Sequence, residues 1–419
     1  MVAIDRQALH VIETLRSGVP CRHVAALLSA GREALVARIL ADAEAVASQG
    51  AAGGCFIQAD YGNGKTHLLA QLQNVAEEKE FVVSLVPLSK ETPLNDPRQV
   101  YRQLAASIQV PRTPLPGISD LLERIPEKSR KADDLVGYAD EHLHGKLAAL
   151  LECYFHDPDA EHRHLLLTDL QGEPVPIPQL KAIYRLLFGS ALKVERFTKE
   201  HVLDYVDLLR RLFHLEGYRG WLVLFDEAEL VGKLGAKSRA EAYYRVGQFL
   251  GLDARLSTDG DAVCGLYTVF SLASGFLSDV LDGKLDLDEA PDRLPLALPR
   301  EGSQVVRDTL PRMLEAHPLA PIDDASLRVL LRSIVDMHTR AYAWPRPPRF
   351  DVDVAMERYR TARLRTRLRV VVQSLDLEYQ YGEVPEVSIG GLAEPGLTED
   401  EAYDTGDPPA SESGPALLG

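Results

Sequence analysis

Residues 60–66 carry side chains whose types and spacing suit phosphate binding, ending in Gly62-Asn63-Gly64-Lys65-Thr66. Two glycines in this run let the backbone turn tightly, so that its N–H groups can point at phosphate oxygens. We expect Lys65 to contact the β- and γ-phosphates of ATP and the Thr66 hydroxyl to bind Mg²⁺. The full set of expected contacts is Asp60, Tyr61, Gly62, Asn63, Gly64, Lys65, Thr66 and His67.

The loop departs from the pattern GxxxxGK[ST] at one position, because Ala59 stands where the first glycine is expected. Alanine is the smallest replacement and fits the end of a strand if its φ angle stays negative. We therefore expect nucleotide binding to survive this change. The alternative is a glycine turn that precedes Lys65 and Thr66 by chance.

A second group of reactive side chains ends the apolar run 221–225, where Asp226 and Glu227 follow directly. Together with the phosphate loop, this pair predicts the chemistry of nucleotide hydrolysis. Asp226 is expected to hold Mg²⁺, and Glu227 to orient and deprotonate the attacking water. Glu229 is the next candidate for the base. In the alternative interpretation, the two acids only cap a helix.

The elements around these residues predict an α/β fold with a parallel sheet. Apolar runs predict strands over 55–59, 81–86, 221–225, 263–270 and 294–298, and helical spacing predicts helices over 4–15, after Gly31 and over 66–76. The order of strand, glycine loop, helix and strand is typical of a parallel sheet.

Composition divides the rest of the chain. We expect an N-terminal helical segment over 1–50 and a nucleotide-binding core over 51–299, interrupted by a helical insertion at about 92–205. A helical lid is expected over 300–382, with helices at about 301–316, 324–338 and 352–377. Residues 383–419 contain nine acids and no Lys or Arg, which predicts an acidic disordered tail.

The overall composition is that of a soluble protein and argues against a protein coated in nucleic acid. The formal net charge is −16, of which the tail accounts for −9, so the remaining −7 leaves room for a local basic face. No apolar run approaches the ~18–20 residues that a membrane helix needs. The N-terminus lacks a signal-peptide core, and the four cysteines form no CxxC pair. We expect a cytoplasmic protein without a membrane partner.

With these motifs in place, the chain resembles an AAA+ P-loop ATPase, and more specifically the BrxD-type ATP-binding proteins of bacteriophage-exclusion (BREX) defence systems. The resemblance rests on the run 15–20, on 31–33, on the loop 61–66, on 224–229 and on 265–267. It implies an AAA+ fold with a five-stranded parallel sheet sandwiched by helices. In this family's terms, the loop is the Walker A motif and the strand that ends in Asp226-Glu227 is the Walker B motif.

The resemblance also implies residues that complete the site. A polar sensor is expected at the end of the strand after the acidic one, with Ser271 favoured over Thr268. Arg293, just before the predicted strand 294–298, is expected to act as an arginine finger in a neighbouring subunit.

Further contacts are expected from the lid and the N-terminal segment. Arg365, favoured over Arg367, would be the lid arginine that senses nucleotide. Adenine would lie against Val19, Pro20 and Gly31.

Residues 346–369 hold eight arginines and three acids, which indicates either a DNA-binding face or a solvated lid helix. Five histidines in the insertion (142, 144, 156, 162 and 164) lack the spacing of a metal site, so surface histidines are favoured.

The sequence therefore predicts an ATP hydrolase of an anti-phage defence system that couples turnover to double-stranded DNA or to other defence-system proteins, with self-assembly into a homo-oligomer. One alternative is a nucleotide-dependent scaffold or switch with little ATP turnover. Another is a replication or repair loader with the same ATPase site. Glu227 favours a hydrolase, since a pure binder needs no carboxylate base.

Overall fold

The computed structural model describes residues 5–17, 22–28, 31–113, 115–253, 255–256, 263–296, 298–299 and 301–383. Two of the predicted adenine contacts, Val19 and Pro20, lie outside these ranges, as do residues 384–419 of the predicted acidic tail. Within the described ranges, no helix has the length and apolar character needed to span a membrane.

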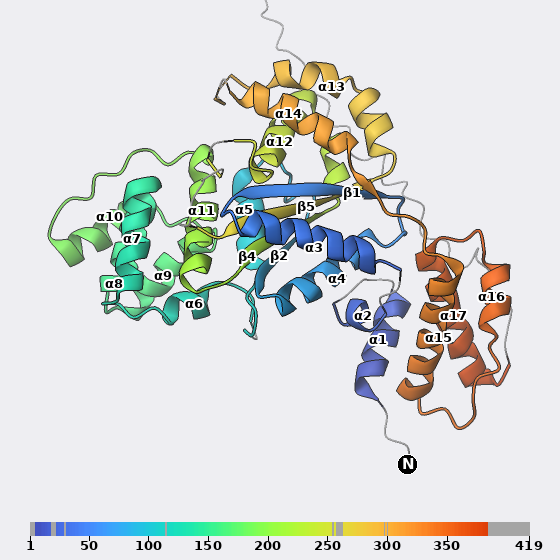
Figure 1. The fold of residues 1–419 in the computed structure, drawn as a ribbon. Coiled ribbons are helices and arrows are strands. Elements are labelled where there is room, and N and C mark those ends of the chain that lie inside the picture. The colour runs from blue at the N-terminus through green and yellow to red at the C-terminus, as the bar shows by residue number, and fades with distance from the viewer. Residues whose placement is uncertain are drawn as a thin grey trace, which may run out of the picture.

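A six-stranded sheet lies at the centre of the molecule (Figure 1). Its strand order is β3-β2-β4-β5-β1-β6, and every neighbouring pair is parallel except β2 and β3. The strands are β1 (Ala52–Ala59), β2 (Phe81–Pro87), β3 (Ile108–Gln109), β4 (Gly220–Asp226), β5 (Gly265–Ala273) and β6 (His317–Pro318). The predicted α/β class with a largely parallel sheet is confirmed, but the predicted number of five strands is wrong.

The difference comes from two very short strands. β3 and β6 have two residues each, and β6 pairs with Ile57 and Gln58 of β1. The predicted strand over 294–298 is wrong, because its described residues follow the 3₁₀ helix η4 (Ala290–Arg293) without joining the sheet. A two-residue strand has no periodicity to detect, and it forms only where a neighbouring strand offers unpaired backbone groups.

Both faces of the sheet are covered, as the apolar strands require. In β4, Trp221, Val223 and Phe225 belong to one buried cluster, whereas Leu222 and Leu224 belong to another. Successive strand residues point to opposite faces, so each cluster occupies one side of the sheet. Helices α3 (Glu33–Ala47) and α4 (Lys65–Glu78) contribute to the second cluster. The first cluster takes residues from α5 (Pro97–Ala106), α11 (Val202–Leu215), α12 (Ala236–Phe249) and α14 (Gly302–Leu314).

Residues 92–205 are largely helical, as predicted, and their helices gather beside α11 (Figure 1). Besides α5, they are α6 (Ser119–Glu123), α7 (Arg130–His142), α8 (Gly145–His156), α9 (Ala160–Leu170), α10 (Ile177–Phe188) and the 3₁₀ helix η1 (Lys199–His201). Leu147 and Leu166 belong to the same buried cluster as Phe56 of β1. The insertion therefore shares one continuous core with the sheet.

Short helices follow the two central strands. They are η2 (Ala228–Lys233) after β4, and the π-helix η3 (Leu277–Asp282) and α13 (Asp286–Glu289) after β5.

The C-terminal helices pack with the start of the chain, at one side of the sheet (Figure 1). Helix α1 (Arg6–Ser17) buries Val11 and Ile12 in the same cluster as Leu331 and Leu375. Helix α1 packs on α15 (Asp324–Ala341) and α17 (Leu364–Tyr381), and α16 (Val352–Arg358) packs on α15. The short α2 (Arg22–Leu27) packs mainly on α4. The stretch 352–377, predicted as one helix, contains two helices, α16 and α17. The α14 helix packs on α12 instead.

Candidate functional site

The glycine loop, residues 60–64, connects the end of β1 to the start of α4. Gly62 and Gly64 have φ angles of 80° and 92°, a region that residues with a Cβ atom rarely adopt. Gly64 occupies the N-cap position of α4, and no side chain caps this helix. The first N–H groups of α4 are therefore available to an anion. Ala59, which replaces the expected glycine, is buried and has no positive φ angle, as the prediction required.

Three elements meet at the carboxylate of Asp226, at the end of β4. Thr66 of α4 donates its hydroxyl to Asp226 Oδ2 at 2.6 Å, and Ser271 of β5 donates to Asp226 Oδ1 at 2.5 Å. Thr268, the other sensor candidate, is buried within β5 and contacts Phe249 O at 3.4 Å. The structure therefore brings Thr66, Asp226 and Ser271 together and leaves Thr268 apart.

Glu227 follows with its backbone in the left-handed region, at φ 59° and ψ 37°. Its N–H donates to Ser271 Oγ and to Asp226 Oδ1, each at 3.1 Å. Such a conformation costs about 1–3 kcal/mol for a residue other than glycine, and it persists where the surroundings hold it. Burial raises the pKa of Glu227 above its ordinary value, and the Asp226 carboxylate adds to this effect.

Lys65 and Glu229 form an ion pair in the same site. Lys65 Nζ donates to Ala59 O at 2.9 Å and lies 3.8 Å from Glu229 Oε1. Glu229 Oε2 is buried without a hydrogen-bond partner. Burial raises the pKa of Glu229, and Lys65 opposes this effect in part. The sequence suggested Glu229 as a second candidate base, but its contact with Lys65 is visible only in the structure.

Lys65, Glu227 and Glu229 line a cavity of about 1110 Å³, which we call the nucleotide-sized cavity. Its polar end holds residues 61–67 with Asp226, Glu227 and Glu229. Its other end is apolar and lies between the N-terminal and C-terminal helices. The apolar side chains contributed by these helices and their flanking residues are Leu15, Val24, Leu28, Ile322, Leu330, Leu364 and Leu368.

Helix α17 reaches the glycine loop through Arg365. Its guanidinium lies 5.2 Å from the Tyr61 ring centroid, and its Nη1 donates to the Tyr61 hydroxyl at 3.2 Å. The Arg365 N–H also donates to Gly62 O at 3.4 Å. Arg367 instead donates to the carbonyls of Ala362 and Arg360 and does not line the cavity. Between the two lid arginines, the structure thus places Arg365 at the site.

Four further cations line the cavity and were absent from the predicted site residues: Arg32, Lys90, Lys233 and Arg369. Arg369 follows Arg365 by four residues, one helical turn, and this spacing was the available signal. Arg32, next to Gly31, donates to Asn63 O at 3.5 Å and to Ala320 O. Burial lowers the pKa of Arg32.

The remaining predicted contacts divide into two groups. His67 lines the cavity and contacts Leu28 O at 3.1 Å, and burial lowers its pKa. Asp60 and Gly31 are not among the cavity-lining residues, and Gly31 lies against Ser326 instead.

Arg293 lies outside the nucleotide-sized cavity of its own chain. Its guanidinium pairs with Glu289 and lies 3.5 Å from Asp286 Oδ1.

Comparison with known proteins identifies the family. The family model described as "BREX system ATP-binding protein BrxC/D" matches residues 4–131 and 146–356. No curated protein gives a significant match to the chain. The matched ranges include the glycine loop, Asp226, Glu227 and Ser271 and end before α17. As the sequence resemblance predicted, the chain therefore belongs to the BrxC/D family of BREX-system ATP-binding proteins.

Proposed function

We propose that this protein is an AAA+ P-loop ATPase that binds and hydrolyses ATP in a BREX-like anti-phage defence system of the bacterial cytoplasm. The observation that carries the proposal is the meeting of Thr66, Asp226 and Ser271 at the end of the glycine loop. The strand order supports it, because β5 lies between the strand of the glycine loop and the strand of the acidic pair. A side chain at the end of β5 can therefore contact both motifs.

ATP would bind with its phosphates at the glycine loop and its base at the apolar end of the nucleotide-sized cavity. The free N–H groups of α4 and the Lys65 ammonium would contact the phosphates. Leu15, Val24 and Leu28 offer the kind of apolar wall that a base packs against.

Thr66 and Asp226 fit a Mg²⁺ site. The Thr66 hydroxyl and a carboxylate oxygen of Asp226 lie 2.6 Å apart. Mg²⁺ prefers oxygen ligands, and proteins usually supply only one or two of them from side chains. Bound Mg²⁺ would neutralise charge on the phosphate oxygens. The chain's own task is to hold the Asp226 carboxylate in place, which the hydrogen bond from Ser271 does.

Glu227 is the proposed general base. Its raised pKa makes it a better proton acceptor than an exposed carboxylate, and its backbone is held in place by Ser271 and Asp226. Arg365 and Arg369 are the proposed lid cations for the phosphates.

The location of Arg293 bears on self-assembly. Because this arginine lies outside the cavity of its own chain, we propose that it completes the site of a neighbouring copy in a homo-oligomer.

A nucleotide switch with little turnover is the second candidate function, and the contact between Lys65 and Glu229 favours it. This ion pair must be rearranged when phosphate arrives, so binding itself would change the site. The rate of ATP hydrolysis by the wild-type protein distinguishes a hydrolase from a switch.

The test is ATP turnover, with and without duplex DNA, of wild type, Lys65→Ala and Glu227→Gln. Lys65→Ala should abolish ATP binding. Glu227→Gln should bind ATP normally and lose about two to four orders of magnitude in turnover, the usual contribution of a general base. Glu78→Gln, an exposed change outside the cavity, is the matched control. Wild-type ATP affinity in Lys65→Ala would refute the proposed site, and tight binding without turnover in wild type would establish the switch.

A further inference from the structure

The arginine-rich face predicted from residues 346–369 is largely engaged within the chain. Arg349 contacts Glu378 and Gly382, and Arg360 contacts Asp324. Of the eight arginines, only Arg346 and Arg369 have no polar partner among the residues that the structure describes. Most of this arginine-rich face is therefore paired within the chain.

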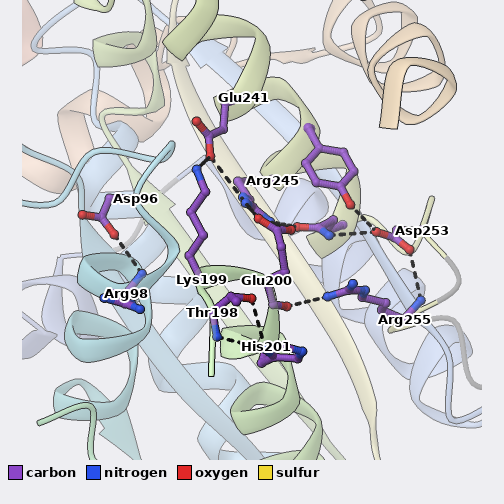
Figure 2. Close-up of polar contacts among 12 residues, drawn as sticks. Asp96, Arg98, Thr198, Lys199, Glu200, His201, Glu241, Arg245, Asp253 and Arg255 are labelled. Carbon is purple, nitrogen blue, oxygen red and sulfur yellow. Dashed lines mark hydrogen bonds and ion pairs between the residues drawn. The ribbon is translucent and has the colours of Figure 1, made fainter. Parts of the chain in front are cut away.

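A second cavity, of about 470 Å³, lies at the first turn of α5 and next to η1. We call it the cationic cavity. It is lined by Asn95, Asp96, Pro97, Arg98, Arg196, Phe197, Thr198, Lys199 and Glu241. Only Pro97 and Glu241 are buried, so the cavity is open to solvent. Figure 2 shows several of these side chains together with the contacts of Glu200 and Arg245.

The two acids of the cationic cavity already have partners. Asp96 caps α5 by accepting the Arg98 N–H at 3.0 Å, and Glu241 pairs with Lys199 (Figure 2). In contrast, the exposed guanidiniums of Arg98 and Arg196 make no hydrogen bond or ion pair with any described residue. The cationic cavity is thus lined by three cations and two acids, and two of the cations, Arg98 and Arg196, have no side-chain partner within the described ranges of this protein, whose net charge is −16.

The segment 189–198, which carries Arg196, is held in place at its C-terminal end by contacts of η1. Arg245 of α12 binds Glu200 of η1 with two hydrogen bonds, of 2.6 and 3.0 Å, and binds Gln248 at 3.0 Å (Figure 2). Thr198 N–H donates to His201 Nδ1 at 3.0 Å. Residues 189–198 themselves contain no helix or strand, and they carry one further exposed cation, Lys193, and one exposed acid, Glu195.

We infer that the cationic cavity binds the phosphodiester backbone of a nucleic acid, with Arg98 and Arg196 each contacting a phosphate. The planar guanidinium matches two phosphate oxygens, and an open cavity lets a strand pass through it. Phe197 offers no stacking platform, because its ring already contacts His144, His201, Tyr205 and the Lys146 ammonium. Binding is therefore to the backbone and independent of base sequence.

The cationic cavity adjoins the nucleotide-sized cavity. Asn95 lines both, and its Oδ1 is buried without a hydrogen-bond partner. The loop 88–95, which follows β2, connects the two sites. Nucleic acid bound at Arg98 can therefore affect ATP turnover, a coupling that rests on the proposed function, whereas the binding itself does not.

The experiment measures binding of the full chain to a 30-base-pair DNA duplex and to one of its strands, by fluorescence anisotropy over a range of salt concentrations. Each phosphate contact contributes a slope of about −0.9 to log K against log salt on duplex DNA. Arg98→Ala/Arg196→Ala should lower the slope by about 1.8, which corresponds to roughly 60-fold weaker duplex binding at 0.1 M salt. Each single variant should show roughly half of this change in slope.

Arg312→Ala/Arg346→Ala is the matched control. It removes the same charge from two exposed arginines that line neither cavity and have no recorded partner among the described residues. It should bind both DNA forms like wild type. Whichever of the two, duplex or single strand, binds more tightly is the form of DNA that the cationic cavity prefers.

Three outcomes would overturn the inference: wild type that binds neither DNA form, an Arg98→Ala/Arg196→Ala variant with wild-type affinity, or an equal loss in the control. A peptide of residues 384–419 that displaces the DNA and binds more tightly through Arg98 and Arg196 would also overturn it, and would assign the cavity to the acidic tail. ATP affinity is measured on the same samples and should not change in Arg98→Ala/Arg196→Ala. A failure of DNA binding is thereby distinguished from a failure of the ATP site.

Discussion

The carboxylate of Glu229 lies 3.8 Å from the ammonium of Lys65, and its second oxygen is buried without a hydrogen-bond partner. Both side chains line the nucleotide-sized cavity. Glu229 therefore competes with phosphate for Lys65 and adds a negative charge where phosphate would bind.

Glu229→Gln should bind ATP and ADP more tightly than wild type. Removing one unfavourable charge of this kind is worth about 1 kcal/mol, roughly five-fold in affinity. Calorimetric titration measures the change. Glu91→Gln serves as the control, because Glu91 lines the same cavity and contacts Ser89 instead of Lys65. Weaker ATP binding by Glu229→Gln would show that this residue holds the nucleotide.

The stability of the protein without nucleotide should reveal the raised pKa values of Glu227 and Glu229. Burial raises the pKa values of both carboxyl groups above 4.5, the ordinary value for a glutamate. The folded state therefore binds the two carboxyl protons more tightly than the unfolded state does. Their favourable contribution is complete below pH 4.5 and is lost as the pH rises through the folded-state pKa values. Glu227→Gln/Glu229→Gln should therefore have a higher Tm than wild type at pH 7.5, with a difference that shrinks toward pH 4.5. Calorimetric scans at both pH values check this, and a difference that does not depend on pH contradicts it.

Ser271→Ala should slow ATP turnover without weakening ATP binding. The Ser271 hydroxyl donates to Asp226 and accepts the Glu227 N–H, so its loss leaves each group of the acidic pair with one hydrogen bond fewer. A hydrogen bond to a charged group contributes about 1.5–3 kcal/mol, which predicts a loss of roughly 10- to 100-fold in kcat when the acidic pair is held less firmly. Thr268→Ala is the control on the same strand, since its hydroxyl contacts Phe249 O. Equal kcat losses in the two variants would indicate a general defect of β5.

Arg365→Ala should weaken ATP binding by about 10-fold, the usual effect of losing a hydrogen bond from a charged group. Arg367→Ala should bind ATP like wild type, because Arg367 faces backbone carbonyls outside the cavity. Tyr61→Phe removes the hydrogen bond to Arg365 and keeps the ring, so its effect on affinity should be smaller than that of Arg365→Ala. Competition with a fluorescent nucleotide gives all three affinities. Normal binding by Arg365→Ala would shift the role to Arg369.

Arg293→Ala should bind ATP normally and hydrolyse it slowly, since a finger from a neighbouring subunit stabilises charge that develops only in the transition state. The specific activity of wild type should rise with protein concentration. A mixture of Arg293→Ala and Lys65→Ala should recover turnover, because one chain supplies an intact pocket and the other an intact finger. A protein that stays monomeric at all concentrations, with a fully active Arg293→Ala, would rule out this arrangement.

The sequence by itself determined the local features around the candidate site. Gly62 and Gly64 are needed for the left-handed turn before α4, and this requirement is local to the chain. The apolar run 221–225 could be recognised as a buried strand because both of its faces are covered. Asp226 and Glu227 then had to lie at the end of that strand.

Only the tertiary structure decided which distant residues meet these motifs. Ser271 contacts Asp226, whereas Thr268 faces Phe249, because the register of β5 against β4 places them so. Arg365 contacts Tyr61 and Arg367 does not, which depends on how α17 packs on α1 and α15. The two-residue strands β3 and β6 likewise exist only through their neighbours. Contacts of this kind depend on the relative placement of segments that lie from tens to hundreds of residues apart, and no local spacing encodes that placement.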